Sequence, residues 1–205
     1  MVTYKGLPAP LICDFLTREA SKAYYVEGTT FHIGTIEMVG NTGTYIDSPF
    51  HRYANGKDLS ELPLTSLADL DGVVFSVNPS EKIIGPEIFA NANVAGKAVL
   101  IHTGWDRHWR SDQYFEDHPH ITAAAAELLQ RSGAALVGID SYNMDGTATG
   151  DRPAHTILLG ADIPIVEHLC HLQDLPADGF RFNAVPVKVK KFGTFPVRAY
   201  AVANT

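Results

Sequence analysis

The sequence predicts a mixed α/β fold built around a single sheet. Short apolar runs typical of buried strands occur in the middle of the chain, with helical spacing between them and a strand-rich stretch at the end. Strands with interspersed helices belong to the layered α/β and α+β architectures. A length of 205 residues with 45% hydrophobic content suits one domain with its own core, so we expect a single domain over residues 1–205.

The first half of the chain contains three expected strands. The first 28 residues lack a clear period and carry prolines at positions 8 and 10, so we expect an irregular entry segment there. Residues 31–39 alternate between two faces and predict a strand. The apolar runs 72–77 and 98–102 predict buried strands, with a short helix at 86–90 between them.

The second half begins with a helix that starts near Pro119, runs to about Arg131 and ends at Gly133. Residues 134–139 predict another buried strand. The strand–helix–strand run from 98 to 140 therefore indicates one parallel crossover. The remaining expectations are a short strand at 164–166 leading into a helix through Leu172, and two closing strands at 182–190 and 195–202.

Composition and charge exclude several functional classes. A formal net charge of −7 argues against nucleic acid as a partner, because phosphate binding needs a basic face. No stretch approaches the 18 apolar residues of a membrane span. Cys13 and Cys170 belong to no Cys/His cluster and cannot build a disulfide framework. We therefore expect a soluble cytoplasmic protein that acts on a small molecule.

Residues 41–51 concentrate groups that carry chemistry. Gly43 permits a tight turn or close approach of the backbone to a ligand, and Pro49 disfavours continuation of a strand. Asp47 and His51 are four residues apart in a segment too rich in turn residues to be helical. These two side chains suit a ligand site, but on this segment alone a turn cap and a hydrogen bond to a loop carbonyl are the more common explanation.

A second pair of candidates lies more than 100 residues later. His155 precedes Glu167 by twelve residues, in an apolar setting that contains an Ile-Leu-Leu run. A histidine before such a run often has a structural role.

The segment from Asn41 to His51 closely resembles H-x-G-T-H-x-D-x-P-x-H, the signature of the bacterial cyclase and kynurenine formamidase family of metal-dependent amidohydrolases. The spacing of His155 and Glu167 is also similar to that of the family. The resemblance runs from about residue 30 onward and includes the segments 102–105, 138–140 and 195–198. It implies a swivelling β/β/α architecture.

The resemblance also implies roles for individual residues. Asp47, His155 and Glu167 match metal ligands of the family, and His51 matches its proton-transfer histidine. Asn41 and Tyr45 stand where the family has two further ligand histidines. Asparagine oxygen is a weak zinc ligand, and a tyrosine must lose a proton to bind a metal.

The remaining ligand set fits one divalent ion. Three protein ligands plus water is typical of a catalytic zinc site, while the oxygen-rich set suits Mn²⁺ or Mg²⁺ as well. We expect one metal, Zn²⁺ or Mn²⁺. The alternatives are a lost metal site, or Asn41 and Tyr45 acting as hydrogen-bond donors that orient Asp47 or a substrate carbonyl.

The expected activity is hydrolysis of a small amide, lactam or ester, with N-formylkynurenine as one aromatic example. A metal would activate water, Tyr45 would steady the developing oxyanion, and His51 would protonate the leaving group. Two alternatives stay open. One is a metal-free small-molecule binding protein, and the other is a metal-independent hydrolase with His51 as base.

Three further residues are candidates for substrate binding. Arg52 could hold a substrate carboxylate, although an adjacent exposed arginine is often plain surface. Trp105 and Trp109 follow a predicted strand end, where ligand clefts form in open α/β sheets. These tryptophans equally suit a loop core or a contact between subunits, and we expect a homo-oligomer, either a dimer or a tetramer. The remaining histidines at 118, 120, 168 and 171 are expected on the surface.

Overall fold

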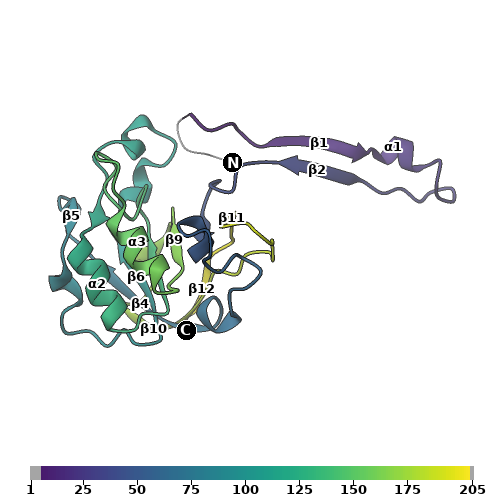
Figure 1. Ribbon diagram of the computed structural model, residues 1–205. Helices are drawn as coiled ribbons and strands as arrows, with labels where there is room; N and C mark the ends of the chain where they lie inside the picture. The colour runs from purple at the N-terminus through teal and green to yellow at the C-terminus, as the bar shows by residue number, and fades with distance from the viewer. Residues whose placement is uncertain (1–5, 204–205) are drawn as a thin grey trace.

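The computed structural model describes residues 6–203, and its centre is an eight-stranded sheet (Figure 1). The strand order is β11-β3-β9-β8-β6-β4-β10-β12. The strands are β3 (Tyr45–Asp47), β4 (Leu70–Ser76), β6 (Ala98–His102), β8 (Leu136–Ile139), β9 (Ile165–Glu167), β10 (Asp178–Asn183), β11 (Thr194–Pro196) and β12 (Tyr200–Ala203).

The middle of this sheet is parallel and its two flanks are antiparallel. Strands β4, β6, β8 and β9 pair in parallel, whereas β3, β10, β11 and β12 pair antiparallel to their neighbours. Only three residues separate the end of β11 from the start of β12, although these strands are opposite edges of the sheet. Since so short a connection spans roughly 14 Å at most, the sheet must curl until its edges approach each other.

Two helices cover one face of the sheet. Helix α2 (Ala123–Arg131) connects β6 to β8, and α3 (Pro153–Gly160) lies beside it (Figure 1). The hydroxyl of Thr122 accepts a hydrogen bond from Ala125 N–H and caps α2. Their apolar side chains pack against one face of the parallel strands, and a second buried cluster around Leu100, Phe180 and Phe182 fills the other face.

Short elements complete the body of the molecule. Strands β5 (Ile83–Ile84) and β7 (His120–Ile121) form a small parallel pair. Six 3₁₀ turns occur within the described residues: η1 (Pro49–His51), η2 (Leu64–Ser66), η3 (Pro86–Phe89), η4 (Trp105–His108), η5 (Asp112–Phe115) and η6 (Leu172–Asp174). None of the helices in residues 6–203 combines the length and apolar character needed to cross a membrane.

An arm extends away from this body (Figure 1). Strands β1 (Leu11–Leu16) and β2 (Ile33–Glu37) pair antiparallel, and the short helix α1 (Arg18–Ser21) follows β1. We call residues 11–37 the arm. Within the described chain, β1 and β2 pair with each other and belong to neither of the other sheets.

The mixed α/β prediction is confirmed, as are the strand at 98–102 and the parallel crossover from β6 to β8. The expected irregular entry segment is wrong, because β1 and α1 lie within it. The expected helix near Pro119 begins only at Ala123, after β7. The helix expected before Leu172 is absent from this described region, because His168 and His171 adopt left-handed φ angles of 58° and 60°.

Candidate active site

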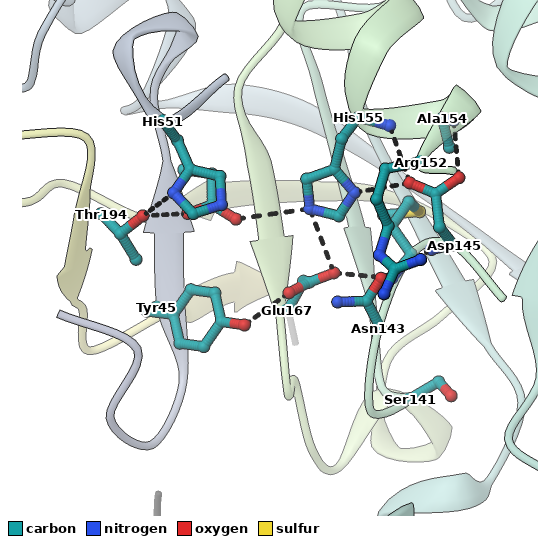
Figure 2. Close-up of polar contacts among 12 residues, drawn as sticks. Tyr45, His51, Ser141, Asn143, Asp145, Arg152, Ala154, His155, Glu167 and Thr194 are labelled. Carbon is teal, nitrogen blue, oxygen red and sulfur yellow. Dashed lines mark hydrogen bonds and ion pairs between the residues drawn. The ribbon is translucent and has the colours of Figure 1, made fainter. Parts of the chain in front are cut away.

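Asp47, His51 and His155 converge in a compact cluster. Figure 2 shows the rings of His51 and His155 in this cluster. One potential ligand atom from each lies within 4.8 Å of the others. Asp47 ends β3, His51 lies on η1, and His155 lies in the first turn of α3. Asp47 and His155 are buried, whereas His51 is exposed, so the cluster opens toward solvent on the side of His51.

The antiparallel pairing of β3 with β11 fixes two members of the cluster. Thr194 lies opposite Asp47 in this pair, and its hydroxyl donates to Oδ1 of Asp47. The Thr194 hydroxyl oxygen also lies 2.7 Å from Nδ1 of His51. Because the hydroxyl gives its one proton to Asp47, it accepts from Nδ1–H of His51, which leaves Nε2 of His51 as the available ligand atom.

Close approach of two backbones brings β11 against η1. A Cβ on Gly193 would lie 2.6 Å from both Cα and N of His51. Real Cβ atoms do not approach other heavy atoms this closely, so a glycine is required before Thr194. This glycine explains how Thr194 reaches both Asp47 and His51.

Asp145 orients His155 from the start of α3. Its carboxylate accepts from the backbone N–H groups of Ala154 and His155, at 2.6 and 3.0 Å, and from Nδ1 of His155 at 2.7 Å. The aspartate therefore caps the helix and holds the imidazole at the same time. With Nδ1 engaged, Nε2 of His155 faces Asp47 Oδ2 and Glu167 Oε1, each at 3.6 Å.

The acidic surroundings determine the charge of His155 when no metal is present. Burial disfavours the imidazolium, but the hydrogen bond to Asp145 and the nearby carboxyl groups of Asp47 and Glu167 outweigh it and raise the pKa of His155 to about 10. A metal at Nε2 must therefore displace a proton, as is usual for histidine ligands.

Tyr45 and Glu167 form a buried pair beside the cluster. They lie opposite each other in the pairing of β3 with β9, and the Tyr45 hydroxyl donates to Oε2 of Glu167 at 2.6 Å. Oε1 of Glu167 accepts from the backbone N–H of Met144, also at 2.6 Å. Burial raises the pKa of Glu167, the charge of His155 lowers it, and the charge of Asp47 raises it again.

One buried atom marks the position where a cation fits. Oδ2 of Asp47 is fully buried and has no hydrogen-bond partner among the described residues. A carboxylate oxygen without a hydrogen bond is costly to bury, and the ion pair of this one within the described residues is with Nε2 of His155, 3.6 Å away. Two imidazoles and this carboxylate are the donor set that divalent transition metals accept, so these residues fit a metal ion.

A cavity of about 630 Å³ lies over the cluster. His51 and His155 line it, together with Asn143 and two arginines, Arg52 and Arg152. Nε of Arg52 donates to the Thr156 hydroxyl at 3.2 Å, and Arg152 Nη1 donates to the carbonyl of Thr149 at 2.8 Å. The cavity is large enough for a small organic substrate and has positive charge at its wall.

Comparison with known proteins identifies the family. A family model described as "Putative cyclase" matches residues 8–146, which is more than half of the chain. The chain belongs to the cyclase family. Kynurenine formamidases from Geobacillus thermodenitrificans and Salinibacter ruber are 32% and 30% identical to it. These alignments cover 84% and 83% of this chain and 81% and 80% of the relatives.

Solved structures share the cyclase fold over nearly the whole chain. Isatin hydrolase A from Labrenzia aggregata superimposes with a TM-score of 0.80 at 22% identity, covering 98% of this chain and 85% of that one. A predicted metal-dependent hydrolase from Bacillus stearothermophilus gives 0.65 at 24% identity, covering 97% and 93%. The fold that the sequence resemblance implied is therefore confirmed, since these solved structures share it.

The structure brings most of the sequence-predicted site residues together. Asp47, His51 and His155 form the cluster, Tyr45 and Glu167 border it, and Arg52 lines the cavity. The geometry gives His51 and Glu167 different surroundings from those the family resemblance implied. His51 lies within the potential ligand set, whereas the two oxygens of Glu167 accept hydrogen bonds from the Tyr45 hydroxyl and the backbone N–H of Met144.

The other predicted substrate-binding residues lie elsewhere. Trp105 is buried, and its Nε1 donates to the Tyr114 carbonyl at 3.0 Å, so it belongs to the loop core. Trp109 lines a second cavity of about 400 Å³. Asn41 is half-buried and is absent from the walls of both cavities.

Two histidines expected on the surface are buried. His118 and His168 are 3% and 7% exposed, and burial lowers the pKa of each, to about 4 and about 3. Nδ1 of His168 and the Tyr114 hydroxyl form a hydrogen bond of 2.8 Å. These rings pack among aromatic side chains that follow the carboxyl ends of β6 and β8.

Asp145, Thr194 and Arg152 carry weak local sequence signals, or none, of a role in this site. Asp145 follows a predicted strand end, which was a weak signal because aspartate also suits a turn. Thr194 has no local motif of its own. Its role depends on the pairing of β11 with β3, which joins residues 147 positions apart.

Proposed function

We propose that this chain is a metal-dependent hydrolase that cleaves a small amide or lactam. The observation that carries the proposal is the Asp47–His51–His155 cluster. Within it, the buried Oδ2 of Asp47 has no hydrogen-bond partner among the described residues. His51 and His155 also line a cavity of about 630 Å³. Family membership supports it, since the relatives at 30–32% identity are kynurenine formamidases. N-formylkynurenine and isatin-like lactams are the candidate substrates, and the former would connect the chain to tryptophan catabolism.

The proposed cofactor is one divalent ion, Zn²⁺ or Mn²⁺, held by Asp47, His51 and His155. Three protein ligands leave positions open for water and substrate, as in catalytic zinc sites. When bound there, the ion would polarise a carbonyl oxygen and lower the pKa of water. Glu167 was the third ligand expected from the resemblance, and we now assign it a positioning role beside His155, because its oxygens already accept from Tyr45 and Met144.

The chain's own residues keep the ligand atoms in place before substrate arrives. Asp145 fixes the ring of His155, and Thr194 fixes both Asp47 and His51. Such preorganisation lowers the reorganisation needed during the reaction. Tyr45 is turned toward Glu167, so its first role in this arrangement is to hold that carboxyl group rather than to steady an oxyanion.

Arg52 and Arg152 favour a substrate that carries a carboxylate. Both line the cavity, and guanidinium groups bind planar carboxylates through paired hydrogen bonds. Asp151 lines the same wall and could receive an ammonium group. We also propose the reducing cytoplasm as the compartment, because both cysteines are free and exposed.

The test is an activity assay of purified protein loaded with Zn²⁺ or Mn²⁺. We expect hydrolysis of N-formylkynurenine or isatin, loss of activity with a chelator, and recovery when the metal is restored. Asp47→Asn should abolish activity, and Asp162→Asn, an exposed aspartate paired with Lys57, is the matched control. Full activity after exhaustive chelation would favour a metal-independent hydrolase. Saturable binding of these compounds without turnover would favour a binding protein.

A further inference from the structure

A second cavity lies apart from the candidate active site. Its volume is about 400 Å³, within the range of roughly 300–1,000 Å³ that is typical of small-molecule sites. Its walls come from two segments, 106–114 after β6 and 168–171 after β9, together with Thr44. Among the described residues, those that line this cavity differ from those that line the cavity over the Asp47–His51–His155 cluster. The proposed hydrolase site therefore leaves this second cavity unused.

Three aromatic rings form one corner of this cavity. The rings of Trp109 and Tyr114 stand at an interplanar angle of 90°, with their centres 5.0 Å apart. His168 closes the corner, with its ring centre 5.5 Å from that of Trp109 and 5.6 Å from that of Tyr114. Tyr114 and His168 are both buried, and the hydrogen bond between them holds the two rings together. The corner is therefore in place before any ligand arrives.

Asp106 brings a carboxylate to the same cavity. Its side chain is half-buried and forms no ion pair within residues 6–203. Its Oδ2 accepts a hydrogen bond of 3.1 Å from the backbone N–H of His171. A partly buried carboxylate without a cationic partner gains from a cation that approaches it, because burial reduces its hydration.

The charges around the aromatic corner favour a cation over an anion. Burial raises the pKa of the Tyr114 phenol, and three nearby carboxyl groups, one of which is Asp106, raise it further. Arg107 also lines the cavity, but its Nη1 donates to a backbone carbonyl of its own turn at 2.8 Å. Nδ1 of His171 lies 3.4 Å from a carboxylate oxygen of Asp174. Both basic side chains are thus engaged outside the corner.

We propose that this second cavity binds a small primary amine in its ammonium form, with an aromatic body. The ammonium group lies against the rings of Trp109 and Tyr114 and donates to Asp106, because ring faces attract cations and a carboxylate accepts N–H groups. A quaternary ammonium ion has no N–H to donate, so a primary amine uses more of these groups. The body of the ligand packs against Leu169 and the ring of His168.

The proposed amine site adjoins the buried Tyr45–Glu167 pair but not the metal cluster. Thr44 precedes Tyr45 in the chain, and His168 follows Glu167. The Thr44 hydroxyl donates to the His168 carbonyl at 2.6 Å, and the ring centres of His168 and Tyr45 are 5.1 Å apart. None of the three cluster residues lines this cavity. Binding there is consequently independent of the proposed hydrolysis.

Isothermal titration calorimetry on the full chain tests the proposal with two probes, phenethylamine and 3-phenylpropionate. Both carry a phenyl ring on an ethylene chain, and they differ in the sign of the terminal charge. We expect saturable binding of phenethylamine and no binding of 3-phenylpropionate. Equal binding of the two probes, or no binding of phenethylamine, would overturn the proposal.

Substitutions then locate the bound amine. Asp106→Asn should weaken phenethylamine binding about 10- to 100-fold, the factor expected for a lost hydrogen bond to a charged group. The asparagine oxygen can still accept from His171 N–H, so the loop keeps its contact. Trp109→Leu keeps an apolar wall without a ring face and should weaken binding roughly 2- to 30-fold. Circular dichroism checks that each variant is folded.

Asp151→Asn is the matched control, because Asp151 lines the cavity over the metal cluster. Its affinity for phenethylamine should equal that of wild type. Loss of binding in Asp151→Asn, or unchanged binding in Asp106→Asn, would place the amine outside the second cavity and overturn the proposal.

Discussion

At the scale of single residues, Tyr45 holds a neighbouring carboxyl group at a position where the family resemblance implied a metal ligand. The position matches a ligand histidine of the family, yet the tyrosine hydroxyl donates to Glu167. A buried phenol resists ionisation, so a hydrogen bond to a carboxyl group is a more favourable arrangement than metal ligation. A tyrosine at a position where the resemblance implies a ligand histidine thus gives Glu167 a hydrogen-bond partner.

Tyr45→Phe should destabilise the protein by about 1–3 kcal/mol, because it removes the donor to a buried carboxyl oxygen. Urea unfolding measures the change. Tyr53→Phe is the control, since the Tyr53 hydroxyl donates to the Thr156 carbonyl at 2.8 Å in a less buried position. An equal loss in the free energy of unfolding at both positions would show that the hydrogen bond to Glu167 stabilises the protein no more than the less buried one does.

Asp145→Asn should lower zinc affinity by about 10- to 100-fold, because partners of ligand histidines set ring orientation and basicity. Competition with a chromogenic chelator measures the affinity. Since Asp145 also caps α3, far-ultraviolet circular dichroism must show that the helix persists. The exposed Asp162→Asn serves as the matched control. Unchanged affinity in the folded variant would mean that Asp145 acts only as a helix cap.

His118 should make the protein sensitive to acid. Burial lowers its pKa from 6.5 to about 4, so the unfolded chain binds a proton that the folded chain refuses between these values. The stability associated with neutral His118 is complete above pH 6.5 and falls by about 3 kcal/mol as the pH drops to 4. The free energy of unfolding of His118→Asn should therefore vary less steeply over this range. Parallel curves for wild type and variant would assign the acid sensitivity to other groups.

At the scale of elements, the pairing of β4 with β10 depends on a missing side chain. Gly72 lies opposite Phe180, and a Cβ on this glycine would come within 2.0 Å of the phenylalanine ring. The ring thus occupies the space that a side chain would need. It is buried in the second core cluster, so it has little room to move.

Gly72→Ala should destabilise the protein by about 1–3 kcal/mol through overpacking. The double variant Gly72→Ala/Phe180→Leu should recover part of this loss, because the smaller side chain vacates the space. Gly150→Ala is the control, as nothing lies within 4 Å of its Cβ position. Thermal unfolding of wild type, the single variants Gly72→Ala and Phe180→Leu, the double variant and the control provides the comparison. Additive effects of the two substitutions would contradict a direct clash.

Elements differed in how well the sequence predicted them, and burial explains the difference. The strand at 98–102 was predicted with the correct bounds, because its first four residues are buried and it reads as a continuous apolar run. The arm strand β1 was missed, since its exposed residues share no pattern dictated by a core. The helix expected after residue 166 is absent there because His168 and His171 have positive φ angles. Nothing in the sequence predicts this conformation for a histidine.

At the scale of the whole molecule, the site depends on strand order. Asp47, Thr194 and Glu167 meet because β3 lies between β11 and β9, although these strands are far apart along the chain. Through resemblance to a family motif, the sequence predicted site residues that the structure brings close together. It could not predict that Glu167 would be held by Tyr45 and Met144, because those contacts arise only from three-dimensional packing.

The most direct test of the three-residue metal site is the metal content of purified variants, measured by inductively coupled plasma mass spectrometry after loading with Zn²⁺ or Mn²⁺. We expect about one ion per chain in wild type, loss of the ion in His51→Ala and His155→Ala, and retention in Glu167→Gln. A protein that keeps its ion in His51→Ala but loses it in Glu167→Gln would contradict the proposed ligand set and restore the one implied by the family. No ion in wild type under any loading would contradict the metal site itself.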